Sequence, residues 1–482
     1  MVGARTSSIF EISILPARLS KKVYLATKLA TSYSVREFAK DMSRILMFGE
    51  NEANEKLATF RQKDKGSTMS DVRPRVDKPI LSIAPDVKHR LPGVPLGDLR
   101  KVADHASKML VNVRESMLAP HPRKKSPVFT TSQIAALCRI DRKKVIYSWD
   151  KPELALPPGT ATNRTREFTL AEAREWIAKL GPFKKRPEGV KGKKIAIGNF
   201  KGGVSKTTTA MTLAQGLSLY GRRILLIDLD PQASLTALTG ILADSEVEED
   251  QTVLPLVYGD QSSVQYAIKP TYWDGIDLIS ASAALFGAEF YLPFKQSKDP
   301  NFEFWNVLNK GLESVLEDYD AVIIDTPPAL SYMTINAFMA ADALVVPTPP
   351  SALDYASSTQ FWNLFADLAD NMKGLVPDVE LKRFDFIHVL LSKVDSNLAS
   401  THAVRDWINR TYESFVLPIE IPTTTVTASA AAEFGTVYDI SKYEGSNRTY
   451  QRAREAYDRF AEMIDQEIVA LWEAEMEATN GD

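Results

Sequence analysis

The sequence predicts an α/β fold in which a parallel sheet is flanked by helices, preceded by a mainly α-helical winged helix-turn-helix domain and an N-terminal helical extension. Three observations support this prediction. After residue 190, short apolar runs without polar alternation recur between helical segments, as in a parallel sheet covered on both faces. The first run leads into a glycine-bearing loop and then directly into a helix. Upstream, residues 130–180 combine short helices, a tight turn and a basic loop.

The chain is too long for one ordinary domain. Its 482 residues favour two or three domains, which we place at residues 1–95, 96–183 and 190–470, followed by an acidic tail at 471–482. The formal net charge of −3 requires any nucleic-acid surface to be local. The single cysteine, Cys138, excludes a disulfide framework and favours a reducing compartment. No apolar run approaches the roughly 18 residues of a membrane span, so we expect a cytoplasmic protein.

The first 95 residues carry the weakest signals. Apolar side chains recur near helical spacing over about residues 35–60, which indicates either a helix that pairs with its copy in a dimer or a poorly ordered extension. Prolines recur over residues 71–97, as is typical of an extended linker. A further helix is expected over residues 96–117.

A helix-turn-helix pattern follows in TTSQIAALCRIDRKKVIYSWDK. Thr131 or Ser132 can cap a short helix that ends at Leu137, and a second helix is expected from Arg142 to Trp149. Basic residues around 163–168 suit a wing, and a capped helix follows up to Leu180. Either this domain contacts DNA or it has only a solvated basic face. The candidate DNA-contacting residues are Ser132, Gln133, Arg142, Lys143, Lys144, Tyr147, Arg164 and Arg166.

The region from 190 to 470 alternates between strands and helices. The acidic segment 243–250 reads as a loop. Trp305, Trp362 and Trp407 fall in helical patterns and are expected in the core. Strands are predicted at 195–197, 224–227, 276–279, 321–324, 343–346 and 386–391, and helices at 207–219, 302–317, 332–340 and 356–370.

The loop after the first strand has the chemistry of a phosphate site. A helix N-terminus attracts anions through its free N–H groups and its dipole. Gly202 and Gly203 let the backbone close around phosphate oxygens, Lys206 can reach the outer phosphates, and the Thr207 hydroxyl is placed to bind Mg²⁺. The glycines of G-x-x-x-x-G-K-[ST] would fall at 200 and 205, where the sequence has Phe and Ser. The loop is therefore a deviant P-loop, and the alternative is an ordinary glycine turn.

Aspartates follow two of the predicted strands. Asp325 ends the apolar run AVIID, where a carboxylate can orient Mg²⁺ through its water shell. Asp228 and Asp230 end the strand after the P-loop helix. Taken alone, these two residues would also suit helix capping.

Three motifs together resemble the ParA family of partition ATPases: NFKGGVSKTTT, RRILLIDLDPQASLTAL and DYDAVIIDTPPAL. The resemblance covers about residues 125–470 and is strongest to the larger plasmid-type members with an N-terminal DNA-binding domain. It implies ATP and Mg²⁺ as cofactors, with Thr207, Asp228 and Asp325 near the metal. In the family, the residue matching Asp230 positions the attacking water, and the lysine matching Lys201 crosses a dimer interface to the partner's nucleotide. The implied ATP-binding residues are Lys201, Gly202, Gly203, Val204, Ser205, Lys206, Thr207 and Thr208.

The same resemblance implies the partners. They are a specific DNA operator, nonspecific DNA, a ParB-like centromere-binding protein and a second copy of the chain, in a nucleoid-associated cytoplasmic location without a membrane. Arg448, Arg452 and Arg454, with Lys442 beside them, are candidates for nonspecific DNA contact; they would otherwise line a solvated helix face. The alternative function is mainly a nucleotide-regulated transcriptional repressor. A membrane-placed septum-site ATPase is rejected because the C-terminus LWEAEMEATNGD is acidic.

Overall fold

The computed structural model describes residues 95–118, 121, 123–149, 151–162, 166–372, 382–426, 430, 434–440 and 446–480. The helix expected over residues 35–60 lies outside this part of the chain, as do Arg164 and Lys442. Residues 93–482 form one compact unit.

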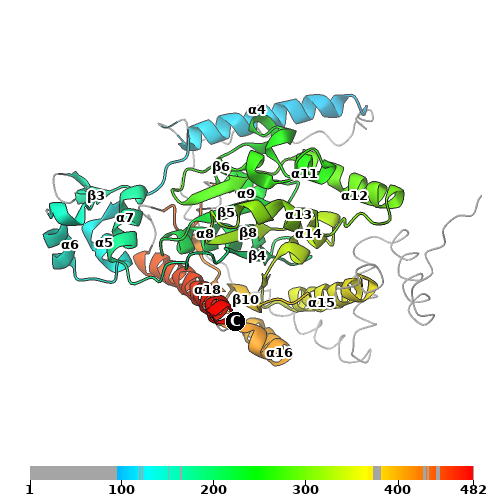
Figure 1. Cartoon of the computed structure of the whole chain (residues 1–482). Coiled ribbons are helices and arrows are strands. Elements are labelled where there is room, and N and C mark those ends of the chain that lie inside the picture. Colours follow the sequence, from blue (N-terminus) through cyan, green and yellow to red (C-terminus); the bar gives the residue numbers. More distant parts are fainter. Residues whose placement is uncertain are drawn as a thin grey trace, which may run out of the picture. The chain divides into compact units, whose positions relative to one another are not determined.

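An eight-stranded sheet lies at the centre of the region after residue 190 (Figure 1). Its strands are β4 (Lys193–Ile197), β5 (Ile224–Asp228), β6 (Lys269–Pro270), β7 (Ile276–Ile279), β8 (Ala321–Asp325), β9 (Ala343–Thr348), β10 (Phe386–Val394) and β11 (Val416–Pro422). The strand order is β11-β10-β9-β4-β8-β5-β7-β6. Every neighbouring pair is parallel except β6 with β7. The predicted parallel sheet is therefore confirmed.

The two edge strands were not predicted from the sequence. β6 is only Lys269–Pro270, and β11 contains Pro418 and Pro422. Proline has no N–H to donate to a ladder, so a strand that contains it belongs at a sheet edge. The same prolines interrupt the apolar pattern on which the strand predictions depended.

Helices cover both faces of the sheet. On one face Ile195 and Ile197 of β4 share a core with α8 (Lys206–Ser218) and α18 (Asn447–Asn480), while Ala196 joins a second core on the other face. The remaining helices of this region are α9 (Ser234–Leu238), α10 (Ala243–Glu246), α11 (Leu254–Tyr258), α12 (Phe286–Lys298), α13 (Val307–Leu312), α14 (Tyr332–Ala340), α15 (Ala352–Met372) and α16 (Ala399–Tyr412), with short 3₁₀ turns at Glu249–Gln251, Val264–Ala267, Ala283–Leu285, Glu313–Val315 and Glu413–Phe415.

Two local predictions were wrong. The segment 243–250 is not a plain loop, because the carboxylate of Glu246 accepts the N–H of Leu242 at 2.7 Å and pairs with Arg114 and Arg123, which stabilises the turn α10. The helix expected over 302–317 is reduced to α13 and a 3₁₀ turn. Trp305 in the preceding segment is buried, as expected, but in a turn rather than in a helix.

The expected acidic tail at 471–482 is also different. α18 continues to Asn480, and Trp472 is only 1% exposed. Ile464, Ile468 and Trp472 recur every four residues on the buried side of the helix, whereas the acidic residues lie between them. The guanidinium of Arg222 lies 4.9 Å from the centre of the Trp472 ring and pairs with Asp465, which fixes this end of the helix.

The region before residue 190 contains a long helix and a small domain. The elements are α4 (Asp98–Leu118), β1 (Phe129–Thr130), α5 (Thr131–Leu137), α6 (Arg142–Ser148), a 3₁₀ turn (Pro152–Leu154), β2 (Thr160–Ala161), β3 (Arg166–Phe168) and α7 (Leu170–Leu180). The strands form an antiparallel sheet in the order β1-β3-β2. The interior of this small domain is formed by the buried residues Ile134, Cys138, Val145, Phe168 and Trp176.

The first short helix is capped one residue earlier than expected. The Thr130 hydroxyl accepts the N–H of Gln133, and the Gln133 side chain accepts the N–H of Thr130, which together make a capping box. The small domain also contacts the sheet region. Arg174 of α7 donates to the carbonyls of Ser218 and Arg222 at 2.7 and 2.9 Å, and Arg139 pairs with Glu462 of α18 at 2.5 Å.

No helix in the described ranges has the length and apolar character needed to cross a bilayer.

Trp407, which was expected in the core, lies on α16 and is 47% exposed, so that expectation was wrong.

Replacing Trp472 with Ala should lower the free energy of unfolding by about 3–5 kcal/mol, because a large buried side chain would leave a cavity. Urea denaturation followed by circular dichroism measures the change. Trp407→Ala is the matched control and should cost less than about 1 kcal/mol, because its side chain is half exposed. Equal losses in the two variants would show that Trp472 does not anchor α18.

Candidate functional site

The carboxyl ends of three neighbouring strands form the site. β8 pairs with β4 on one side and with β5 on the other, in a register that places Asp228 opposite Asp325. Parallel strands end at the same edge of a sheet, so the loop after β4 lies beside both aspartates. α8 starts from this loop, and the positive end of its dipole faces the same edge.

The backbone of the loop turns sharply at two residues. Gly203 and Ser205 have φ angles of 76° and 77°, in the left-handed region. Glycine adopts this conformation easily, whereas Ser205 is strained, as residues in ligand-binding loops often are. Asn199 holds the start of the loop, because its buried amide donates to the carbonyl of Pro347 at 3.0 Å and accepts the N–H of Lys201 at 3.1 Å.

The loop is also held from the end of β10. The Ser392 hydroxyl donates to the carbonyl of Val204 at 3.0 Å, and Lys393 Nζ donates to the carbonyl of Gly203 at 2.6 Å. Asn199, Ser392 and Lys393 were not predicted as site residues. Asn199 is the first residue of the motif NFKGGVSKTTT, but no pattern in the sequence links the other two to the loop.

Lys206 lies over the loop that precedes it. Its ammonium donates to the carbonyl of Lys201 at 3.0 Å, and its side chain is buried. Burial lowers the pKa of Lys206, while Asp325 and Asp230 oppose this shift. The ammonium is therefore directed at the edge where the carboxylates gather, and a phosphate oxygen can replace the carbonyl as its acceptor.

Asp228 is fully buried and hydrogen-bonded on both oxygens. It accepts the N–H and the hydroxyl of Thr236, each at 2.8 Å, and the N–H of Asp230 at 3.1 Å. Burial raises the pKa of Asp228 to about 7, against the effect of these hydrogen bonds. The Asp230 carboxylate is more accessible and accepts the N–H of Gln232 at 2.9 Å. Asp228 is thus a fixed internal carboxylate, and Asp230 is the one at the rim.

Asp325 has an unmet requirement for a partner. Both of its carboxylate oxygens are buried, and neither has a hydrogen bond within 3.5 Å in the described part of the chain. Burial raises the pKa of Asp325 well above its usual range and Asp228 raises it further, whereas the nearby Thr207 hydroxyl and Lys206 lower it. A carboxylate of this kind fits a hydrated Mg²⁺, with the Thr207 hydroxyl as a direct ligand.

The remaining metal ligands would have to come from elsewhere. Within the described ranges no group of three or more His, Cys, Asp or Glu side chains is arranged to hold a metal by itself. Mg²⁺ accepts such a site when phosphate oxygens and water complete its octahedron. The residues present therefore fit Mg²⁺ bound together with a phosphate.

Lys201 has a partner in its own chain. Its ammonium lies 2.5 Å from a carboxylate oxygen of Asp354, in the first turn of α15. Gly202 faces Pro328 in the loop after Asp325. The structure thus brings together the predicted loop residues Lys201, Gly202, Gly203, Val204, Ser205, Lys206, Thr207 and Thr208 with Asp228, Asp230 and Asp325.

The predicted DNA-contacting residues of the small domain lie in different environments. Ser132, on α5, is exposed, and so are Arg142, Lys143, Lys144 and Tyr147 on α6. The side-chain oxygen of Gln133 is occupied by its capping box. Arg166 lies over the Trp149 ring at 4.5 Å and donates to the carbonyl of Pro158, so it braces the hairpin. Ile146 and Lys151 were not predicted, and with Lys143 and Tyr147 they line a hollow of about 490 Å³.

The C-terminal arginines also divide into two groups. Arg448 and Arg452 are exposed near the start of α18. Arg454 was a wrong candidate, because it packs over the Tyr438 ring at 4.2 Å and pairs with Asp458. Arg405 of α16 and Arg459 of α18 were not predicted, although with Arg452 they line a cavity of about 510 Å³ that also contains two glutamates.

Comparisons with known proteins agree with this geometry. Residues 192–376 match an AAA domain family. Protein SopA of Escherichia coli (strain K12) is 32% identical over 317 residues, which cover 64% of this chain and 79% of SopA. The chromosome partitioning protein ParA of Myxococcus xanthus (strain DK1622) is 31% identical over 56% of this chain and 89% of its own length. A solved partition protein shares the fold, with a TM-score of 0.55 and 20% identity over 77% of this chain and 97% of that protein.

Lys206→Ala should reduce the affinity for Mg-ATP at least about a hundredfold, because a buried ammonium directed at the phosphates contributes a charge-assisted hydrogen bond. Isothermal titration calorimetry measures the affinity. Lys310→Ala removes an exposed lysine on α13 and should leave the affinity unchanged. An unchanged affinity in the Lys206 variant would contradict the phosphate role of the loop.

Proposed function

Because the chain belongs to the ParA family of partition ATPases, we propose that it hydrolyses ATP to drive the segregation of DNA. The observation that carries this proposal is the buried Asp325 with two unpaired carboxylate oxygens, next to Lys206 and Thr207 at the end of a deviant P-loop. In this function the N–H groups of the loop and of the first turn of α8 bind the phosphates. Mg²⁺ would neutralise phosphate charge in the transition state.

Each acidic residue then has a distinct role. Asp230 at the rim orients the attacking water, because its carboxylate is the more accessible of the pair on this loop. Asp228 is hydrogen-bonded to Thr236 and to the Asp230 N–H, so it positions Asp230 and the metal region rather than contacting water. Asp325 and Thr207 hold the metal region from the other side. A single water-positioning carboxylate supports a weak intrinsic rate.

We further propose that ATP assembles a sandwich dimer through Lys201. In a single chain the Lys201 ammonium is paired with Asp354. That pair is partly exposed, so exchanging Asp354 for a phosphate of the partner subunit's nucleotide costs little. In the dimer the lysine neutralises charge on the phosphates, as an arginine finger does. Hydrolysis then removes the anion that Lys201 contacts and releases the dimer.

The proposed DNA contacts lie on two surfaces. The exposed basic side of α6 suits operator recognition, and the hollow beside Tyr147 suits contact with a base or sugar. On α4, Leu99, Val102, Met109 and Val113 are exposed at spacings of three, seven and four residues, which supports pairing with a second copy at a two-fold operator. Arg448 and Arg452 supply nonspecific contacts in the nucleoid-associated state. A ParB-like centromere-binding protein would stimulate hydrolysis.

The second candidate function is a nucleotide-regulated repressor. The contacts of Arg174 with the carbonyls of Ser218 and Arg222 favour it, because they attach the helix-turn-helix domain to the end of α8. The two functions differ in whether Lys201 and Asp230 are needed for segregation or only for repression.

Asp230→Ala should still bind Mg-ATP, because Lys206, Thr207 and the loop are intact, but it should hydrolyse ATP at least about a hundredfold more slowly and accumulate as an ATP dimer. Lys201→Ala should lose both the dimer and hydrolysis, with a smaller loss of ADP affinity. Analytical ultracentrifugation with ATP distinguishes the two variants. An Asp230 variant that stays monomeric at saturating ATP, or a Lys201 variant that dimerises and hydrolyses normally, would rule out the sandwich mechanism.

Lys143→Ala should weaken binding to a duplex taken from directly upstream of the protein's own coding sequence by about tenfold, because a phosphate or base contact on α6 is lost. Fluorescence anisotropy of the labelled duplex measures this. Lys310→Ala serves as the control for lost positive charge. If Lys143→Ala binds this duplex as tightly as the control variant does, α6 is not the recognition helix.

A further inference from the structure

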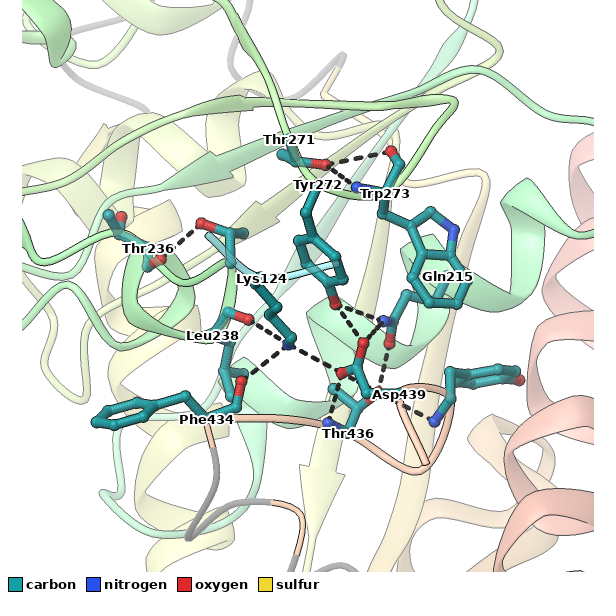
Figure 2. Close-up of polar contacts among 12 residues, drawn as sticks. Lys124, Gln215, Thr236, Leu238, Thr271, Tyr272, Trp273, Phe434, Thr436 and Asp439 are labelled. Atoms are coloured by element: carbon teal, nitrogen blue, oxygen red, sulfur yellow. Dashed lines mark hydrogen bonds and ion pairs between the residues drawn. The ribbon is translucent and has the colours of Figure 1, made fainter. Parts of the chain in front are cut away.

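We propose that Lys124 couples the nucleotide site to the helix-turn-helix domain through the buried contacts that its ammonium makes with the sheet region. This inference rests on the proposed function and concerns its regulation. Lys124 lies between α4 and β1, in the segment that leads into the small domain. Its side chain extends from that segment into the sheet region, as Figure 2 shows.

Four groups of the sheet region surround the Lys124 ammonium. It donates to the carbonyls of Leu238 and Phe434 at 2.8 and 2.9 Å, and it pairs with Asp439 at 3.0 Å. The ammonium also lies over the face of the Tyr272 ring, with 4.3 Å between the nitrogen and the ring centre. Only 9% of the side chain is exposed. A buried charge with this many partners is stable only when all of them are in place, so the contact is either made or broken as a unit.

One set of partners leads to the aspartates of the nucleotide site. Leu238 is the last residue of α9, and Thr236 in the same short helix donates its N–H and its hydroxyl to Asp228. The N–H of Ala281 donates to the Thr236 hydroxyl at 2.9 Å, which fixes that hydroxyl. A displacement of Asp228 that accompanies metal or phosphate binding therefore moves α9, and with it the carbonyl to which Lys124 donates.

The other set of partners leads to the P-loop helix. Asp439 accepts the hydroxyl of Tyr272 at 2.6 Å and the amide of Gln215 at 3.4 Å (Figure 2). The Thr436 hydroxyl donates to the Gln215 carbonyl oxygen at 2.6 Å. Gln215 belongs to α8, which starts at Lys206. The two elements that would contact the nucleotide, α8 and the segment after β5, are therefore both linked to the Lys124 ammonium, the first through Asp439 and the second through Leu238.

The segment around Lys124 is attached at a second point. Arg114 and Arg123 both pair with Glu246, which also accepts the N–H of Leu242, the residue directly before α10. The chain that leads into β1 and α5 thus contacts α9 at Leu238 and α10 at Glu246. A displacement of α9 would therefore move the segment around Lys124, and with it the helix-turn-helix domain that this segment leads into.

The test compares nucleotide effects in the wild type and in the double variant Lys124→Met with Asp439→Asn. The double variant removes both charges together, so it avoids leaving a single buried charge without a partner. Lys125→Met is the control, because Lys125 is the exposed neighbour on the same segment. Full-length proteins are compared with Mg-ADP and with Mg-AMPPNP by hydrogen–deuterium exchange of peptides covering α5 and α6, and circular dichroism checks that each variant is folded.

We expect the wild type and Lys125→Met to show different exchange in α5 and α6 with the two nucleotides. In the double variant this difference should fall at least about fivefold, the lower end of ordinary allosteric coupling, while nucleotide affinity stays within about twofold. Lys124→Arg keeps the charge and should retain most of the difference. If the double variant is unfolded, Asp439→Asn alone is compared with Lys125→Met by the same measure.

Two results would overturn the proposal. One is a wild type that binds both nucleotides but shows no difference in α5 and α6, since nothing would then be transmitted. The other is a double variant, or Asp439→Asn alone, that keeps the full difference. A wild type that binds neither nucleotide would instead contradict the proposed ATPase function, and calorimetry separates that failure from the other two.

Discussion

Two buried carboxylates lie side by side at the ends of adjacent parallel strands, because β5 and β8 pair with Asp228 opposite Asp325. This placement is electrostatically unfavourable, since burial raises the pKa values of both groups and the charge of Asp228 raises the pKa of Asp325 further. The surrounding structure limits the cost. Thr236 and the Asp230 N–H stabilise the charged form of Asp228, while Lys206 and Thr207 oppose the shift at Asp325. The loop, the start of α8 and α9 are therefore arranged around one electrostatic requirement, which a bound cation would satisfy.

Much of the fold and the centre of the site could be predicted from the sequence because they depend on neighbours along the chain. The P-loop residues, Asp228, Asp230 and Asp325 all lie at the ends of apolar runs, and parallel strands bring such ends together. Asp354, Ser392 and Lys393 reach the loop only through the folded sheet, so no local pattern marks them. The capping box of Thr130 and Gln133 had a recognisable sequence signature, a threonine followed three residues later by a glutamine. Gln133 was instead interpreted as a DNA-contacting residue. The stripe of Ile464, Ile468 and Trp472 was hidden by the acidic residues between its members.

Polar contacts between the small domain and the sheet region add to an apolar core that the two regions share, since Ile134 and Trp176 belong to the same cluster of buried side chains as Leu217. Arg139, Arg174 and Lys124 all reach into the sheet region from the N-terminal side and end on carbonyls or carboxylates. Contacts of this kind have strict geometry and lose most of their energy after a small displacement, whereas apolar packing tolerates sliding. The shared apolar core therefore holds the small domain against the sheet region, and the polar contacts define its position.

The two edge strands of the large sheet are poorly suited to pairing with another copy of the chain, which favours solubility at high concentration. One edge strand, β6, is a lysine followed by a proline, and the other, β11, contains Pro418 and Pro422. An open parallel sheet presents unpaired backbone groups at its edges, and a second copy can add to them and start aggregation. Proline has no N–H, and a charged side chain on a short strand discourages stacking, so neither edge is a good template for another strand. Many copies can therefore be crowded together without growing into cross-β fibres.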